Sequence, residues 1–300
     1  MKPGLREAHA AARPLVSPLA HDALSARLIE AAGFKAFNIG GSSLLAARHA
    51  LPDLGLAGLG EMAAAIRDTI EPVNIPCLVD GDDGYGDVKS VTRTIQVLEG
   101  IGVAGILLED QGRENKRPGA DAAQSVVPIG MMLQKIRAAL AARANSDLVI
   151  LGRTDALGSD GLDEALRRGE KMLQAGADGV FVAGLKTPEQ FSRVGRAFKG
   201  QWNAAAIFEA RGTPVIGAPE LYEMGFSQVV LPNSLILRVV KTIETTLRQF
   251  QAYGKGEKGA IGAADSELSL AGFQEAVKMP KWNAIERDFA IVNAPAAMDK

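Results

Sequence analysis

Residues 98–110 read LEGIGVAGILLED, a segment with helical character that ends at a glycine and is followed at once by an apolar run. A glycine just after a helix, with apolar residues behind it, is typical of a joint between a helix and a strand. The pattern occurs three more times, at residues 30–40 (EAAGFKAFNIG), 173–184 (LQAGADGVFVAG) and 221–232 (LYEMGFSQVVLP). The sequence therefore predicts four helix-to-strand joints of one kind.

Four more short apolar runs alternate with these joints, which brings the number of expected strands to eight. They are PLVSPLA (14–20), IPCLVDGD (75–82), DLVILGRTDA (147–156) and NAAAIFEA (203–210). Strands that alternate with helices predict a parallel sheet, and eight such units over roughly 250 residues predict a closed (β/α)8 TIM barrel. A doubly wound open sheet is the alternative, but its usual G-x-G-x-x-G after the first strand is absent.

The last fifty residues have a different character, so we divide the chain into a barrel at 1–250 and a tail at 251–300. Residues 251–267 are polar and rich in glycine, which is typical of an exposed connector. LSLAGFQEAV (268–277) and KWNAIERDF (281–289) then place apolar residues at helical spacing. These amphipathic helices need a surface, which is either their own barrel or another subunit.

The composition is that of an ordinary globular protein, with 47% apolar and 23% charged residues. A net charge of −2 argues against a nucleic acid or an anionic membrane as partner. The single cysteine, Cys77, excludes an intramolecular disulfide framework and fits a reducing cytosol. We see neither a signal peptide nor an apolar stretch long enough to span a membrane, and we expect a cytoplasmic protein.

Two of the expected strands end abruptly in carboxylates. LVDGDDGYGD (78–87) carries four acidic residues separated by glycines, and GILLEDQ (105–111) carries two more. Active sites of such barrels lie at the carboxyl ends of the strands, and Mg²⁺ prefers oxygen ligands, of which one or two are usually carboxylates. The segments therefore predict a divalent-cation site, although an acidic, solubilising turn remains the alternative for each.

Further groups that suit an anionic substrate follow other strands. Arg153 can hold a carboxylate or a phosphate with its planar guanidinium group, or can simply pair with Asp155. The run Gly40 to Ser43 can offer backbone N–H groups to an anion, or can be only a turn. A metal, an arginine and amide donors together suit the stabilisation of an enolate. Residues 111–128 form a long loop that we interpret as a lid or as a solvated loop.

These motifs resemble the isocitrate lyase/phosphoenolpyruvate mutase superfamily over most of the chain. The resemblance is carried by AHDALSARLIEAAGFKAF, LPDLGL, LVDGDDGYGD, GILLEDQ and LGRTDA. It implies a modified TIM barrel, Mg²⁺ (with Mn²⁺ as an alternative), and anionic 2-oxo or 2-hydroxy acid substrates that react through an enolate-like intermediate. It also implies a homo-oligomer, a dimer or a tetramer, in which a C-terminal helix is exchanged between subunits.

The resemblance also implies roles for individual residues. Metal-site residues would be Asp80, Asp82 and Glu109, and catalytic residues would be Asp53, Arg153, Glu209 and, in the loop, Arg117. The substrate would be held by Gly40, Gly41, Ser42, Arg153, Asn233 and Ser234.

Two departures from the lyases of this family bear on the reaction. Their gating loop carries K-[KR]-C-G-H, whereas residues 116–120 here read KRPGA, without the cysteine and the histidine. A glutamate that follows their sixth strand is Gly184 here. We therefore predict Mg²⁺-dependent carbon–carbon cleavage or decarboxylation of a small 2-oxo or 2-hydroxy acid. The alternatives are a phosphonomutase or phosphonopyruvate-type hydrolase, and a catalytically silent carboxylate-binding protein.

Overall fold

The computed structural model describes residues 4–112, 125–261 and 269–289. The predicted loop residue Arg117 lies outside these ranges. The chain forms two compact units, residues 1–241 and residues 242–300. We describe each unit by itself.

The first unit is a closed barrel of eight parallel strands, which confirms the predicted fold. Each strand pairs with the next in chain order, and β1 closes the ring by pairing with β8, with Leu15 opposite Gln228. The strands are β1 (Leu15–Ala20), β2 (Phe37–Ile39), β3 (Cys77–Asp80), β4 (Gly105–Glu109), β5 (Val149–Thr154), β6 (Gly179–Val182), β7 (Trp202–Ala206) and β8 (Gln228–Leu231).

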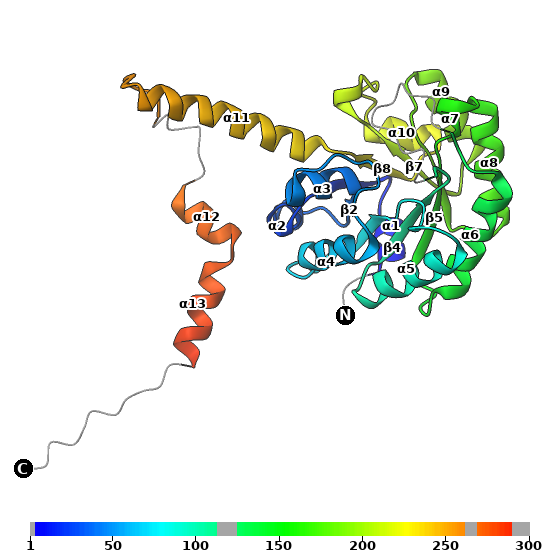
Figure 1. Ribbon diagram of the computed structural model, residues 1–300, viewed down its shortest axis with the longest axis horizontal. Helices are drawn as coiled ribbons and strands as arrows, with labels where there is room; N and C mark the ends of the chain where they lie inside the picture. The colour runs from blue at the N-terminus through cyan, green and yellow to red at the C-terminus, as the bar shows by residue number, and fades with distance from the viewer. Residues whose placement is uncertain (1–3, 113–124, 262–268, 290–300) are drawn as a thin grey trace, which may run out of the picture. The chain divides into compact units, whose positions relative to one another are not determined.

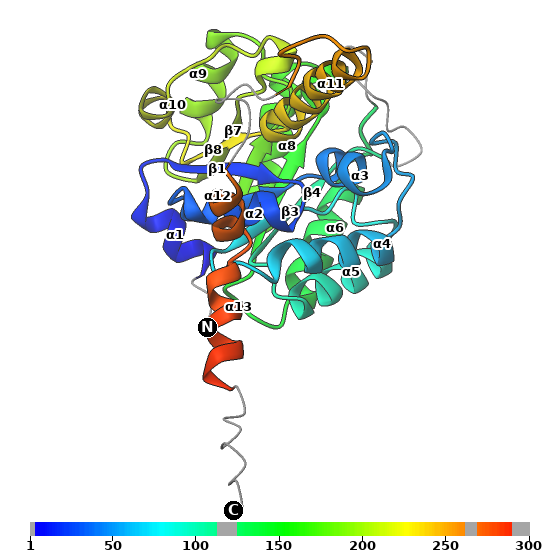
Figure 2. The ribbon, with the colours of Figure 1, turned by 90° about the vertical axis from the view of Figure 1, so that its left-hand side faces the viewer.

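Helices surround the strands, as Figures 1 and 2 show for α4, α5, α6 and α8. Because their buried faces pack on the outside of the barrel, the strands are buried on both sides, and the polar side chains among them, such as Gln228 and Ser17, are hydrogen-bonded to each other. The helices of this unit are α1 (Leu5–Ala11), α2 (Ala23–Ala31), α3 (Gly41–His49), α4 (Leu59–Ile70), α5 (Val88–Gly100), α6 (Ile129–Ala142), α7 (Ala156–Ser159), α8 (Leu162–Gln174), α9 (Pro188–Ala197) and α10 (Ala218–Met224), with a 3-10 turn η2 (Glu209–Arg211) and the start of α11 (Ser234–Gly254).

Side-chain caps start several helices soon after a strand has ended. Asp22 accepts a hydrogen bond from a backbone N–H of the first turn of α2, at 2.7 Å. Asp87 does the same for α5, and Thr187 for α9. Such caps satisfy amide groups that have no partner within the helix. The chain can therefore turn from strand to helix over a few residues and leave short loops at the carboxyl ends of the strands.

The amino-terminal end of the barrel is closed by apolar packing. Leu5 of α1 is 1% exposed and belongs to a cluster with Leu15, Leu78 and Trp202. His9 of the same helix stacks on Trp202 with 3.7 Å between ring centroids, and its Nε2 lies 2.8 Å from the Ser227 hydroxyl oxygen. Because helix α1 fills this end, a substrate has to enter from the opposite end, where the strands terminate.

The chain between β4 and α6 leaves and re-enters the barrel at one place. Gln111 and Val126 form an isolated antiparallel bridge. Next to it, the backbone N–H of Val127 donates to the carbonyl oxygen of Asp110, at 2.8 Å. We call residues 110–112 and 125–127 the neck of this segment.

The second unit contains the remainder of α11, α12 (Leu270–Ala276) and α13 (Met279–Asp288). None of the described residues of α12 and α13 is buried. Their large apolar side chains include Phe273, Trp282 and Ile285. The predicted apolar helix faces are therefore present in the tail. In the described part of the chain, no helix has the length and apolar character needed to cross a membrane.

Candidate active site

A cavity of about 310 Å³ opens among the residues that end the strands. Its deeper part is lined by side chains of the barrel interior, such as Leu78 and Leu151. Its mouth is lined by the strand ends, including Gly40 after β2, Asp80 at the end of β3 and Arg153 on β5. This volume is at the lower end of the range for small-molecule sites, so the cavity suits a substrate of a few carbon atoms.

Arg153 is the most strongly constrained charged group at the cavity. Its Nε and Nη2 donate to both carboxylate oxygens of Asp155, at 2.9 and 2.8 Å. Its Nη1 lies 3.2 Å from Asp80 Oδ2 and 3.1 Å from Glu109 Oε2. Burial by itself would lower the pKa of the guanidinium group, but the three carboxylates hold it well above its usual value. Arg153 is therefore a fixed cation that lines the cavity.

The loop after β3 brings its carboxylates to the same place through unusual backbone geometry. Asp82 has a φ of 49°, and its backbone N–H donates to Asp80 Oδ1 at 3.0 Å. The backbone carbonyl oxygen of Asp82 accepts a hydrogen bond from the backbone N–H of Glu109, at 2.9 Å. Gly84 has a φ of 79°, and a Cβ there would lie 2.4 Å from a methyl group of Val91. Only glycine fits at this position, so the glycines between the acidic residues serve the turn.

Lys135 fixes the far side of this loop. Its ammonium group donates to the carbonyl oxygen of Asp83 at 2.7 Å and lies 3.4 Å from the carboxylate of the same residue. Both side chains are nearly fully buried. The contact links α6 to the loop and holds the aspartate at the end of β3 in position.

The predicted amide turn is the first turn of a helix. Gly40 is the N-cap of α3, which begins at Gly41, so the run from Gly40 to Ser43 is more than a turn. The N–H groups at a helix start lack intrahelical acceptors and carry partial positive charge, which favours an anion. Gly40, Gly41 and Ser42 line the cavity, and the Ser42 hydroxyl donates to Asn233 Oδ1 at 3.1 Å. These residues fit the amide site that the sequence predicted.

Asp53 lies between α3 and α4 and also lines the cavity. A Cβ on Gly41 would lie 3.8 Å from Oδ1 of Asp53 and 3.8 Å from Oδ1 of Asp82. The two carboxylates therefore both lie near the start of α3 and within twice that distance of each other. The predicted residues Asp53, Asp82 and Gly41 come together at one point.

Four of the predicted residues are not among the described residues that line the cavity. Asp82 and Glu109 contact residues that do line it, Asp80 and Arg153 respectively. The other two have partners elsewhere. Glu209, in η2, is 46% exposed and accepts hydrogen bonds from both terminal nitrogens of Arg238, at 2.8 and 3.2 Å. The hydrogen bond from Arg238 lowers the pKa of this carboxyl group. Ser234 opens α11, and its hydroxyl lies 3.5 Å from the carbonyl oxygen of Pro232. Neither Glu209 nor Ser234 is among the described residues that line the cavity.

The cavity also includes residues that the sequence analysis did not select. Gln111 is 2% exposed and lines the cavity, and its amide nitrogen has no hydrogen-bond partner among the described residues. A signal was present, because Gln111 directly follows the two carboxylates that end β4. Lys186 and Phe181 also line the cavity, and the Arg153 guanidinium lies 5.8 Å from the centre of the Phe181 ring. Gly184, the position at which the lyases have glutamate, has a φ of 83°. A side chain there would strain the backbone.

The acidic groups fit a magnesium ion that is held mainly through water. Among the described residues, no three His, Cys, Asp or Glu side chains form a direct metal cage. Mg²⁺ normally takes only one or two protein carboxylates and completes its octahedron with water and substrate oxygens. Asp80 lines the cavity, and Asp53 and Asp82 lie next to the start of α3. The carboxylate oxygens of these three aspartates match the ligand type that Mg²⁺ prefers.

The barrel and its cavity define the protein as a (β/α)8-barrel enzyme. Residues 5–251 match the family model for phosphoenolpyruvate phosphomutase. The chain is 31% identical to the 2,3-dimethylmalate lyase of Eubacterium barkeri, over 95% of this chain and 97% of the relative. The chain therefore belongs to the phosphoenolpyruvate mutase/isocitrate lyase superfamily and is an enzyme of the lyase type.

Solved structures agree with this assignment. Oxaloacetate acetylhydrolase in complex with the inhibitor 3,3-difluorooxalacetate has a TM-score of 0.86 and 29% identity, over 95% of each chain. Phosphonopyruvate hydrolase in complex with oxalate and Mg²⁺ has a TM-score of 0.80 and 26% identity, over 95% of this chain and 97% of that chain. The relatives therefore include enzymes that are named for carbon–carbon and for phosphorus–carbon chemistry on small acids.

Proposed function

We propose that the protein cleaves a carbon–carbon bond of a small 2-hydroxy or 2-oxo acid, with Mg²⁺ as cofactor. The observation that carries the proposal is the position of Arg153, a fixed cation that lies among several carboxylates and lines the same cavity as the start of α3. An arginine and free helix amides bind a carboxylate well. The surplus of acidic groups at the same place favours a divalent cation rather than a second anion.

Asp80 is the residue that we expect to contact Mg²⁺ directly, with Asp53 and Asp82 acting through water. The relative crystallised with oxalate and Mg²⁺ supports the choice of cation. When bound, the cation supplies charge that stabilises a developing enolate oxygen. Glu109, which contacts Arg153, orients the guanidinium group in this proposal.

In this proposal, different side chains of the cavity bind a 2-hydroxy acid and transfer its protons. Arg153 and the amide groups of Gly41 and Ser42 hold the carboxylate next to C2. Asp53 accepts the proton of the C2 hydroxyl. As the C2 carbonyl forms, the C2–C3 bond breaks, and its electron pair passes to the C3 fragment, which leaves as the enolate of a carboxylic acid. A proton delivered to C3 completes the reaction and gives a 2-oxo acid and a carboxylic acid.

The described part of the protein offers no thiol for this last proton transfer. The single cysteine, Cys77, is 3% exposed on β3, its sulfur faces the backbone carbonyl of Leu78, and it does not line the cavity. Residues 116–120 read KRPGA and contain no cysteine either. The proton therefore comes from water or from a group that is not a thiol.

The shape of the cavity narrows the substrate further. Its walls carry Phe181, Leu185 and Phe208 as well as the polar groups. Apolar walls favour a short alkyl substituent on the acid. Small alkylmalates fit this description.

A Mg²⁺-supplemented screen tests the proposal. The substrates are oxaloacetate, alkylmalates, methylisocitrate and phosphonopyruvate, and the readouts are pyruvate, oxalate and inorganic phosphate. We expect turnover of an alkylmalate or of oxaloacetate, and its loss in Arg153→Gln. Phosphate release from phosphonopyruvate alone would assign the protein to the phosphorus–carbon branch. No turnover of any of these acids would contradict the proposed function.

A further inference from the structure

A buried ion pair lies behind the cavity without lining it. Asp110 is 0% exposed and Arg168 is 6% exposed, and Arg168 Nη1 lies 3.1 Å from Asp110 Oδ2. Neither residue is among those that line the cavity. A buried ion pair pays a large desolvation cost, and replacing it by apolar side chains is often neutral or stabilising. Stability alone is therefore a poor explanation for this pair.

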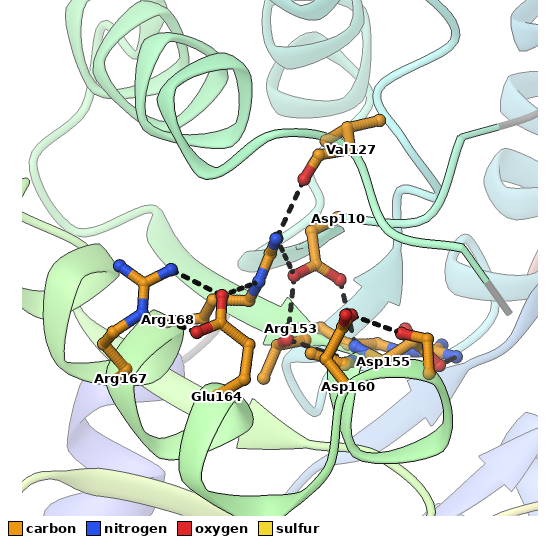
Figure 3. Close-up of polar contacts among 11 residues, drawn as sticks. Asp110, Val127, Arg153, Asp155, Asp160, Glu164, Arg167 and Arg168 are labelled. Carbon is orange, nitrogen blue, oxygen red and sulfur yellow. Dashed lines mark hydrogen bonds and ion pairs between the residues drawn. The ribbon is translucent and has the colours of Figure 1, made fainter.

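The contacts of Asp110 converge on the end of β5. Its Oδ1 accepts the backbone N–H of Asp155 at 2.9 Å, and its Oδ2 accepts the hydroxyl of Thr154 at 2.8 Å. Its own backbone N–H donates to the carbonyl oxygen of Arg153 at 3.2 Å. Figure 3 shows the carboxylate of Asp110 between Arg168 and Asp155. The residue that directly follows β4 therefore binds three consecutive residues at the end of β5.

The middle step of the network is the side chain of Asp155. It is 6% exposed and receives two parallel hydrogen bonds from Arg153, which in turn reaches toward Asp80 and Glu109. A bidentate pair fixes the plane of a guanidinium group as well as its position. A shift of the Asp155 backbone would therefore rotate or displace the Arg153 cation at the cavity.

Arg168 holds the other side of Asp110. Besides the carboxylate, its Nη1 donates to the carbonyl oxygen of Val127 in the neck at 2.9 Å, and its Nε donates to Glu164 at 2.8 Å. The neighbouring Arg167 contacts Glu164 as well, but its side chain is 44% exposed and no described contact joins it to Asp110. Two adjacent arginines thus share one partner, and one of them alone reaches the buried network.

We propose that Asp110 and Arg168 are positioning residues for Arg153. The pair keeps the end of β5 and the carboxylate of Asp155 in the one arrangement that points the guanidinium group at the substrate. The inference rests on the proposed function for the role of Arg153, but Asp110 and Arg168 themselves touch no substrate. Because small displacements of a substrate-positioning group cost up to about a hundredfold in rate, we expect kcat/KM to fall about ten- to a hundredfold when the pair is broken.

The kinetic test compares Asp110→Asn, Arg168→Met and the milder Thr154→Val with Arg167→Met as matched control. Arg167→Met removes a guanidinium from the same Glu164 and leaves Asp110 untouched. Rates are measured per mole of folded protein, well below each melting temperature, and kcat is separated from KM. We expect the three network variants to lose kcat/KM and the control to keep it. If the pair were purely structural, the network variants would have a lower melting temperature but unchanged kcat and KM. That result would overturn the proposal.

A double-mutant cycle tests whether the effect passes through Asp155. If Asp110 acts through that side chain, Asp110→Asn combined with Asp155→Asn should lose no more than the worse single variant, whereas independent effects would multiply. Multiplying losses would overturn the proposed route. Amide exchange of the backbone N–H of Asp155 needs no turnover, so it separates this inference from the proposed function. We expect faster exchange in Asp110→Asn than in wild type and in Arg167→Met, and equal exchange would overturn the inference.

Discussion

Arg153 and Glu109 lie opposite each other on the neighbouring strands β5 and β4, with 3.1 Å between Nη1 and Oε2. Glu109 is 2% exposed, so its negative charge is compensated by the guanidinium group rather than by bulk water. The same guanidinium also serves Asp80 and Asp155. One cation therefore faces three carboxylates, and the local charge remains negative, which is the basis of the metal prediction.

Magnesium should stabilise the folded protein through this acidic group. A ligand that binds only the native state at a hundredfold excess over its Kd adds about 2.7 kcal/mol. We expect Mg²⁺ to raise the melting temperature of the wild type, and Asp82→Ala to abolish the rise without unfolding the barrel. Asp163→Ala, which removes an exposed carboxylate paired with Arg193, is the control and should keep the rise. An undiminished Mg²⁺ effect in Asp82→Ala would remove Asp82 from the site.

Catalysis should not depend on a thiol. Because Cys77 is buried on β3 and does not line the cavity, Cys77→Ser should keep most of the wild-type turnover. Mild treatment with iodoacetamide should likewise leave the rate unchanged. Rapid inactivation that substrate blocks would contradict both the placement of Cys77 and the thiol-free mechanism.

His9 should make the stability of the protein depend on pH. Burial, with a smaller effect of Arg13, lowers the pKa of His9 to about 4, while an unfolded histidine has a pKa of 6.5. A histidine that is neutral in the folded state contributes stability that is fully present above pH 6.5 and is lost as the pH falls toward 4. The free energy of unfolding in urea should therefore decrease across this window.

His9→Phe keeps a ring against Trp202 and should make this decrease shallower. It should not remove the decrease, because burial also lowers the pKa of His21. His49→Gln changes an exposed histidine and should retain the wild-type slope. An identical slope in His9→Phe and in wild type would show that His9 does not titrate in this window.

The tail should hold subunits together. None of the described residues of α12 and α13 is buried, and Phe273, Trp282 and Ile285 are exposed. Large exposed apolar groups of this kind mark association surfaces. We expect an oligomer at micromolar concentration by light scattering, and a lower mass or aggregation after deletion of residues 262–300. Deletion of 290–300 alone serves as control. A soluble oligomer of unchanged mass after the longer deletion would contradict the prediction.

The barrel was predictable because its signals are local and repeated. Seven of the eight apolar runs contain one observed strand, and the eighth (203–210) overlaps β7, which begins one residue earlier at Trp202. The glycine joints at Gly33, Gly102, Gly176 and Gly225 all have positive φ. Closure of the ring between β1 and β8 has no local signal, and it was inferred only from the number of units. The repeated β/α pattern was therefore enough to predict the fold class. The closure of the barrel had to be inferred from the number of strands.

The site was predictable only where strand ends carry the chemistry. Asp80, Arg153 and Gly40 follow from that rule, and the structure places them at one cavity. The run from Gly40 to Ser43 was expected as a turn and starts a helix, because the same small residues suit both. Glu209 satisfied the same rule but pairs with Arg238, 29 residues further along the chain.

Contacts between distant residues explain what the sequence could not reveal. Arg168 lies in the middle of α8 and meets Asp110 across 58 positions. Its neighbour Arg167 has the same chemistry and lies at the surface. Nothing in the local pattern separates the two arginines, since the difference depends only on which face of α8 lies against β5 and β6.

The neck between β4 and α6 holds two parts of the chain together at the barrel. Gln111 pairs with Val126, and Arg168 binds Val127, so both ends are fastened by residues that belong to the barrel. Closing a loop of different length costs little, about 0.6 kcal/mol per doubling. We therefore expect a change in the number of residues between 112 and 125 to leave the neck and the position of Arg153 as they are.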